Sequence, residues 1–262
     1  MKYWKIGVVA FLTLGFFVGG TWFYSNPSEQ ISTLNKQKIP HNANRTTASE
    51  QDLIEQINGR IINIKDRSEI KPLIDQIIAL SDSNEHKDNH ALQLYRAVAE
   101  PMKHMESIIW RLREVVEKSG LLHIQALSMI RNAYYKDYMY GPHILAIMDY
   151  LTMPSDTHLQ FQKIENVQDF AETELKPTLE KSLTTVKALI SKTDSDWAFA
   201  FDAYLTSGYD PDNNKVFISD AKRFEKQVNH QYLYFIEANL HRVIGSIEFL
   251  TNYNFNDYPK FV

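Results

Sequence analysis

Three residues near the C-terminal end of the chain have the types and spacing that acid–base or metal chemistry requires. They are His230, Glu237 and His241. Residues seven and eleven apart return to nearly the same side of an α-helix, so the carboxylate and both imidazoles would share one face. A carboxylate that orients a histidine occurs in catalytic and metal sites, but Glu237 and His241 are equally an ordinary i,i+4 surface pair. We take the set as the candidate catalytic residues.

A second pair of histidines, His86 and His90, lies in the segment His-Lys-Asp-Asn-His. Two histidines four residues apart on a helix can hold zinc or another divalent metal. The zinc-protease pattern requires a glutamate directly after the first histidine, and Lys87 stands there, so that mechanism is excluded. A solvated helix start explains the pair equally well, because the sequence offers no third ligand. We predict no cofactor and keep the pair as candidate metal ligands.

Four tyrosines gather at the predicted end of a helix. They are Tyr134, Tyr135, Tyr138 and Tyr140. Tyrosine rings can stack on a ligand or form the centre of a protein interface, and they also pack along helix ends with their hydroxyl groups in water. We take these four as the candidate binding surface.

Other patterns exclude several classes of function. Gly-x-Gly-x-x-Gly, the phosphate-binding loop and Gly-x-Ser-x-Gly do not occur, and the calcium-like start at Asp210 lacks the glycine and glutamate that the loop needs, since Lys215 and Ala221 stand there. The chain has no cysteine, which excludes disulfides and thiolate chemistry. A net charge of −4 without a cluster of basic residues argues against nucleic-acid binding.

An uncharged segment over residues 6–24 is long enough to cross a membrane. As a helix it would measure about 28 Å, close to the hydrocarbon thickness of a bilayer. Lys2 and Lys5 precede it and the first charge after it is Glu29, so the positive-inside rule places the N-terminus in the cytoplasm. We predict a signal anchor over residues 1–24, with the remainder extracytoplasmic, which means periplasmic in a bacterium.

A cleaved signal peptide is the alternative, with a cut near Gly20 that would release a secreted protein. Residues 25–48 are polar and lack an apolar period, which is typical of a flexible linker. An exported helical domain is expected over residues 49–262.

Apolar residues recur at spacings of three and four through most of this domain, which predicts an all-α fold. We expect a bundle or irregular array of about eight helices, over residues 49–64, 70–80, 92–116, 121–138, 143–153, 166–191, 195–208 and 219–250. Pro101 and Pro177 should kink two of them. Phe199 gives one segment a period-two alternative, and residues 216–218 are the candidate strand.

Export, a helical body and the lack of an assembled active site together favour a binding function over catalysis. We predict a membrane-tethered scaffold or adaptor that binds a protein of the cell envelope and contacts the membrane through residues 6–24. A metal-dependent or acid–base enzyme, or a helical bundle that binds a ligand, is the alternative. The sequence does not determine the oligomeric state.

Overall fold

The structure is a computed structural model that describes residues 48–118, 142–202 and 225–252. Most residues in these ranges are helical, which confirms the predominantly helical class. None of the helices there is both long enough and apolar enough to cross a membrane. Several predictions fall outside the described residues, namely the anchor, the linker, the helix over residues 121–138 with its four tyrosines, and the strand over residues 216–218.

The elements follow one another along the chain in a simple order. They are α3 (Ala48–Ile62), the short 3-10 helix η1 (Arg67–Glu69), α4 (Ile70–Asp82), α5 (His90–Met102), α6 (Ile108–Lys118), α8 (Pro142–Thr152), α9 (Ile164–Phe170), the π-helical turn η2 (Ala171–Leu175), α10 (Lys176–Lys192), β1 (Ala198–Asp202), β2 (Glu225–Asn229) and α12 (His230–Asn252). α9, η2 and α10 run on without a break and form one long rod.

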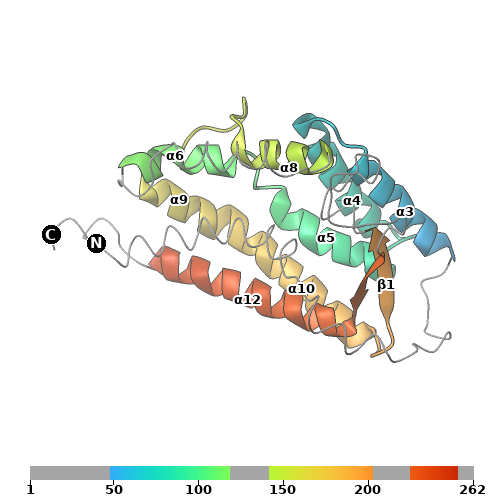
Figure 1. Ribbon diagram of the computed structural model, residues 1–262. Helices are drawn as coiled ribbons and strands as arrows, with labels where there is room; N and C mark the ends of the chain where they lie inside the picture. Colours follow the sequence, from blue (N-terminus) through green and yellow to red (C-terminus); the bar gives the residue numbers. More distant parts are fainter. Residues whose placement is uncertain (1–47, 119–141, 203–224, 253–262) are drawn as a thin grey trace, which may run out of the picture.

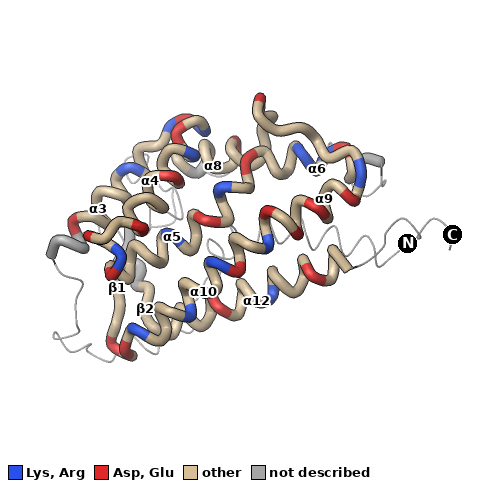
Figure 2. Tube along the Cα trace, turned by 180° about the vertical axis from the view of Figure 1, so that it is seen from behind, with Lys and Arg blue, Asp and Glu red and all other residues tan. Residues whose placement is uncertain are grey.

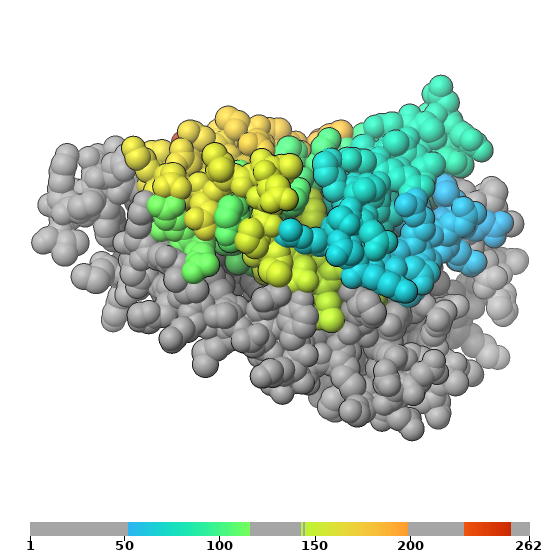
Figure 3. Space-filling view, turned by 90° about the horizontal axis from the view of Figure 1, so that it is seen from above, coloured from blue at the N-terminus to red at the C-terminus, as the bar shows by residue number. Residues whose placement is uncertain are grey.

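The helices pack in layers (Figure 1). α5 lies in the middle, with α4 packed on one side of it and α10 on the other. α12 packs against α10 and forms the outer layer of the described part on that side. On the opposite side, α3, α4 and α8 come to the surface (Figure 3). α12 is therefore held by one flank and leaves the other flank free of described elements.

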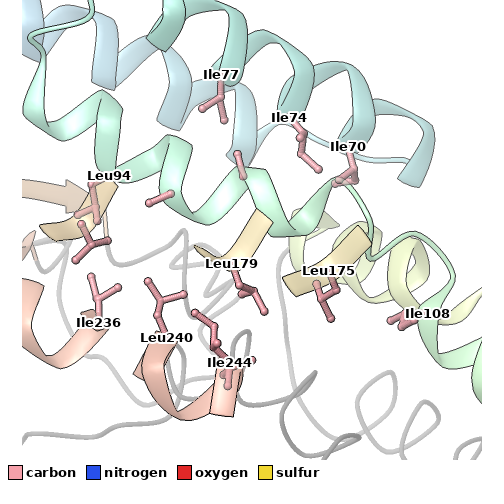
Figure 4. Close-up of a cluster of buried hydrophobic side chains, with 14 of the residues drawn as sticks. Ile70, Ile74, Ile77, Leu94, Ile108, Leu175, Leu179, Ile236, Leu240 and Ile244 are labelled. Atoms are coloured by element: carbon pink, nitrogen blue, oxygen red, sulfur yellow. The ribbon is translucent and has the colours of Figure 1, made fainter. Parts of the chain in front are cut away.

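One cluster of buried aliphatic side chains runs through these layers (Figure 4). Leu240 and Ile244 of α12 point toward Leu179 of α10. The stripe predicted for α12 is confirmed, because all of its members are buried: Leu233, Ile236, Leu240, Val243, Ile247 and Leu250. Each such side chain stabilises the fold by about 1.5–3 kcal/mol on burial.

The single helix predicted over residues 92–116 is wrong, because the chain breaks into α5 and α6 after Pro101. Pro101 has no N–H to donate to the carbonyl oxygen four residues earlier. After it, the chain forms a tighter turn, in which His104 N–H donates to Pro101 O, three residues back, at 3.2 Å. Ser107 adopts a left-handed φ of 56°, and its N–H donates to Tyr150 O of α8 at 2.7 Å. A tertiary hydrogen bond thus replaces a helical one, which gives a break where we expected a kink.

The irregularity expected at Pro177 takes the form of the π-helical turn η2. Lys176 N bonds to Ala171 O, five residues back, directly before the proline. A wider turn of this kind lets the helix continue past a residue that cannot donate a hydrogen bond. The long rod therefore stays continuous from α9 to α10.

Two helices begin slightly before their predicted caps. α3 starts at Ala48, so Ser49 lies inside its first turn. α9 starts at Ile164, and Asn166 lies within its first turn, where its Oδ1 accepts a hydrogen bond from Lys163 N at 3.2 Å. Asn166 thus supports the helix start from inside the first turn and does not act as the N-cap.

The helix predicted over residues 195–208 is also wrong where the structure describes it. Residues 198–202 form β1, which pairs antiparallel with β2, and Phe199 lies opposite Val228. The aromatic residues of this segment alternate with alanine, and that pattern suits a strand once a partner is present. Because β2 precedes it, α12 begins at His230 and not at Ser219.

Candidate functional site

The three candidate catalytic residues all lie on α12, but the structure brings only two of them close together. Glu237 Oε1 is 3.8 Å from His241 Nε2 and 3.9 Å from Lys187 Nζ of α10. His230 lies two turns earlier, about 10 Å along the helix axis. Its Nδ1 is 2.9 Å from Thr193 Oγ1, so it ties the start of α12 to the end of α10.

The candidate metal ligands do not share a helix face. His86 lies in the turn before α5, 3.9 Å from Glu85 Oε2, whereas His90 is the first residue of α5. The His90 ring stands edge-on to Trp197 with 6.5 Å between ring centroids. In the ranges that the structure covers, no group of three or more histidine, aspartate and glutamate side chains is arranged to hold a metal ion.

The flank of α12 that faces away from α10 carries an aromatic surface, which we call the α12 outer face. Its members are Tyr234, Phe235, Ala238, Gly245 and Phe249. The three aromatic residues are 52%, 42% and 58% exposed, and Leu159 is the one other large hydrophobic residue of the described part that is exposed. We take these aromatic side chains as a candidate contact surface, because burying exposed aromatic surface is favourable.

Small residues occupy the middle of the α12 outer face. Ala238 and Gly245 lie seven residues apart, which is about two helical turns. A Cβ atom at Gly245 would meet no described atom within 4 Å. Glycine inside a helix costs about 0.5–1 kcal/mol relative to alanine. Packing among the described residues therefore does not require a glycine at this position.

Charged residues are few along α12 (Figure 2). Glu237, Arg242 and Glu248 are the acidic and basic residues of this 23-residue helix. Both carboxylates lie near lysines of α10, since Glu248 Oε1 is 3.5 Å from Lys176 Nζ. An open, polar depression of about 300 Å³ adjoins Glu248, between η2 and the end of α12. It is too open to enclose a small molecule, so the aromatic face remains the main feature of this side.

A second concentration of charged groups lies where α6 meets the segment between α8 and α9. Arg111 is buried there, with its Cζ 4.3 Å from the ring centroid of Phe161 and 4.5 Å from that of Phe170. Its Nε and Nη1 have no hydrogen-bond partner among the described residues. Burial lowers the pKa of Arg111, while the nearby carboxylates of Glu174 and Glu106 act in the opposite direction.

Those two carboxylates are each close to a histidine. Glu174 Oε2 is 3.2 Å from His104 Nδ1, and Glu106 Oε2 is 3.7 Å from His158 Nε2. Ser155 Oγ also donates to Glu106 Oε1 at 2.8 Å. These contacts connect the break after α5, the turn η2 and the segment after α8. We therefore assign this cluster a structural role, which the sequence patterns did not reveal because its members come from distant segments.

Comparison with protein-family models, with curated proteins and with solved structures found no match to the chain. The geometry of the described residues offers an exposed aromatic helix face and contains no assembled catalytic group.

The three–four spacing of α12 predicts its buried stripe but not the α12 outer face. Tyr234, Phe235 and Phe249 fall between the positions of the stripe, so the helix is apolar on two sides. A surface helix with a single buried face normally carries polar residues on the other. Apolar residues on two sides of α12 were therefore the sequence feature that could have predicted this surface.

Proposed function

We propose that the protein is a membrane-tethered, extracytoplasmic helical module that binds another protein through the α12 outer face. The observation that supports this function is the presence of three half-exposed aromatic residues on one outer helix, with small residues between them. Aromatic side chains supply large contact areas and dominate the energetics of many protein interfaces.

The described packing suits a scaffold or adaptor of the cell envelope. α12 is anchored by its buried stripe, so the aromatic residues are held in place before a partner arrives, which lowers the entropic cost of binding. The predicted linker over residues 25–48 would let the domain search the space near the membrane, over a root-mean-square distance of about 25–30 Å.

A photo-crosslinking amino acid at Phe235 or Phe249 of the full-length protein, expressed in cells, tests this function. We expect discrete crosslinked products from both positions. Thr184, exposed on α10, is the matched control position and should give no such product. The proposal fails if the two α12 positions give no product in protein shown to be folded and exported, or if Thr184 gives the same products.

A further inference from the structure

We propose that Asn58 in α3 is a site of slow deamidation, and that Tyr95 of α5 protects it while α3 is packed. Asn58 is the one asparagine of the chain that is directly followed by glycine. Glycine has no side chain to hinder the approach of its own nitrogen to the preceding asparagine, and its backbone adopts many conformations. Of the asparagines in the chain, Asn58 therefore has the least hindered following residue.

The reaction requires only water. The Gly59 backbone nitrogen attacks the side-chain carbonyl carbon of Asn58 and forms a new C–N bond. The amide nitrogen of the Asn58 side chain takes up the proton that Gly59 N loses, and it leaves as ammonia. Water then opens the resulting cyclic imide at either of its carbonyl groups. The product is an aspartate, or an isoaspartate in which the backbone runs through the side chain.

The packed form of α3 blocks the attack. In an α-helix the N–H of Gly59 donates to the carbonyl oxygen four residues back, and the helical backbone holds its nitrogen away from the Asn58 side chain. Asn58 is only 8% exposed, and its Oδ1 accepts a hydrogen bond from the Tyr95 hydroxyl group. Burial raises the pKa of Tyr95, and the hydrogen bond to Asn58 acts in the opposite direction. The hydroxyl group therefore keeps its proton at physiological pH and remains a donor.

Deamidation consequently proceeds through local opening of α3. This helix lies at the surface of the described part, and its contacts with α4, α5 and α8 are much smaller than the contact between α5 and α10 (Figures 1 and 3). Gly59 also weakens α3, because glycine lowers helix stability relative to alanine. Elements with little packing open more often than the centre of a fold, so the reaction is slow but continuous.

The product prevents α3 from returning to its packed form. An aspartate places a carboxylate in a buried position beside Tyr95, which costs free energy. An isoaspartate adds a backbone atom between Ile57 and Ile61, so these two side chains no longer lie on the same face of the helix. A brief opening thus becomes permanent. With the tether of the proposed function in place, the 15 residues of α3 would then lengthen the linker predicted over residues 25–48.

Incubation of the purified full-length protein, followed by digestion and mass spectrometry of the peptide that contains residues 58 and 59, tests the site. We expect aspartate and isoaspartate at position 58 in the folded protein. They should accumulate about ten-fold more slowly there than in protein unfolded in urea, because only the open form of α3 reacts.

Two substitutions separate the protection by Tyr95 from the reactivity of Gly59. Tyr95→Phe removes one hydrogen bond, so it should raise the rate in folded protein about five-fold and leave the rate in urea unchanged. Tyr150→Phe is the matched control, because its hydroxyl group donates to Met102 O instead, and it should leave the rate at position 58 unchanged. Gly59→Ala should lower the rate about ten-fold in both conditions, since a side chain hinders the attack. Alanine fits there, because a Cβ atom would meet no described atom within 4 Å.

Asn58→Asp tests the consequence for α3 directly. Limited proteolysis within residues 48–62 should be about ten-fold faster in this variant than in the unmodified protein, and an equal rate would show that the modification does not release α3. The site itself is overturned if the folded protein gives no product at position 58, or if folded and unfolded protein react equally fast. Protection by Tyr95 is overturned if Tyr95→Phe has no more effect than Tyr150→Phe. None of these measurements depends on binding through the α12 outer face.

Discussion

Glu100 shows how a single charge connects three helices. Its side chain is buried in α5, with Oε1 at 2.5 Å from Lys181 Nζ of α10 and 3.3 Å from Arg96 Nε. Arg96 in turn lies 2.6 Å from Asp82 Oδ1 at the end of α4. Removal of one member of a buried charge network is costly because the remaining charges keep their desolvation but lose their partner.

We predict that Glu100→Gln lowers the free energy of unfolding by about 2 kcal/mol. This is less than the loss expected for a fully buried ion pair, because half of the Lys181 side chain is exposed to solvent. Urea unfolding followed by circular dichroism measures this. Glu180→Gln, on the exposed side of α10, is the control and should change the free energy by less than about 0.5 kcal/mol. Equal effects of the two substitutions would contradict the assigned role of Glu100.

Arg111 provides a second prediction at the scale of a residue. Its guanidinium stacks on two phenylalanine rings but leaves two buried nitrogens without partners among the described residues. Arg111→Met keeps an apolar side chain of similar volume against the two rings and removes the buried charge. We therefore expect the free energy of unfolding to be unchanged or raised by up to about 1–2 kcal/mol. Arg111→Ala should lower it by about 2–3 kcal/mol, because it leaves a cavity.

Thermal unfolding of both Arg111 variants checks this expectation. If methionine destabilises the protein as much as alanine does, the charge itself stabilises the fold and the stacking account is wrong.

At the scale of elements, the break between α5 and α6 depends on the left-handed backbone of Ser107. Ser107→Gly should raise the free energy of unfolding by about 1 kcal/mol, since glycine adopts this φ without strain. Ser107→Ala removes the buried hydroxyl group but keeps the strain, so it separates the two effects. Chemical denaturation should give a higher free energy of unfolding for Ser107→Gly than for Ser107→Ala. The reverse order would show that the backbone at Ser107 is not strained.

At the scale of the whole molecule, the proposed tether predicts how the protein partitions in the cell. Full-length protein should stay with membranes after alkaline carbonate extraction and should keep its N-terminal Met1. Deletion of residues 1–24 should abolish membrane association. A mature chain that starts at Thr21 would instead establish cleavage near Gly20 and a secreted protein.

The candidate site residues show what helical spacing alone can and cannot predict. The helical period correctly put His230, Glu237 and His241 on one helix, but a shared side does not bring residues seven apart into contact. His86 and His90 do not share a helix, because α5 begins only at His90. The exposed aromatic residues were visible in the sequence, yet only the packed structure shows which apolar side of α12 is covered.

The sequence by itself determined the features that arise from local patterns. The three–four spacing predicted most of the described helices and the buried stripe of α12, because helix periodicity and burial act over neighbouring residues. The tertiary structure decided the break at Ser107 and the strands β1 and β2, because each needs a hydrogen-bond partner far away in the chain. Tyr150 O and the strand Glu225–Asn229 are those partners, and a local pattern carries no information about them.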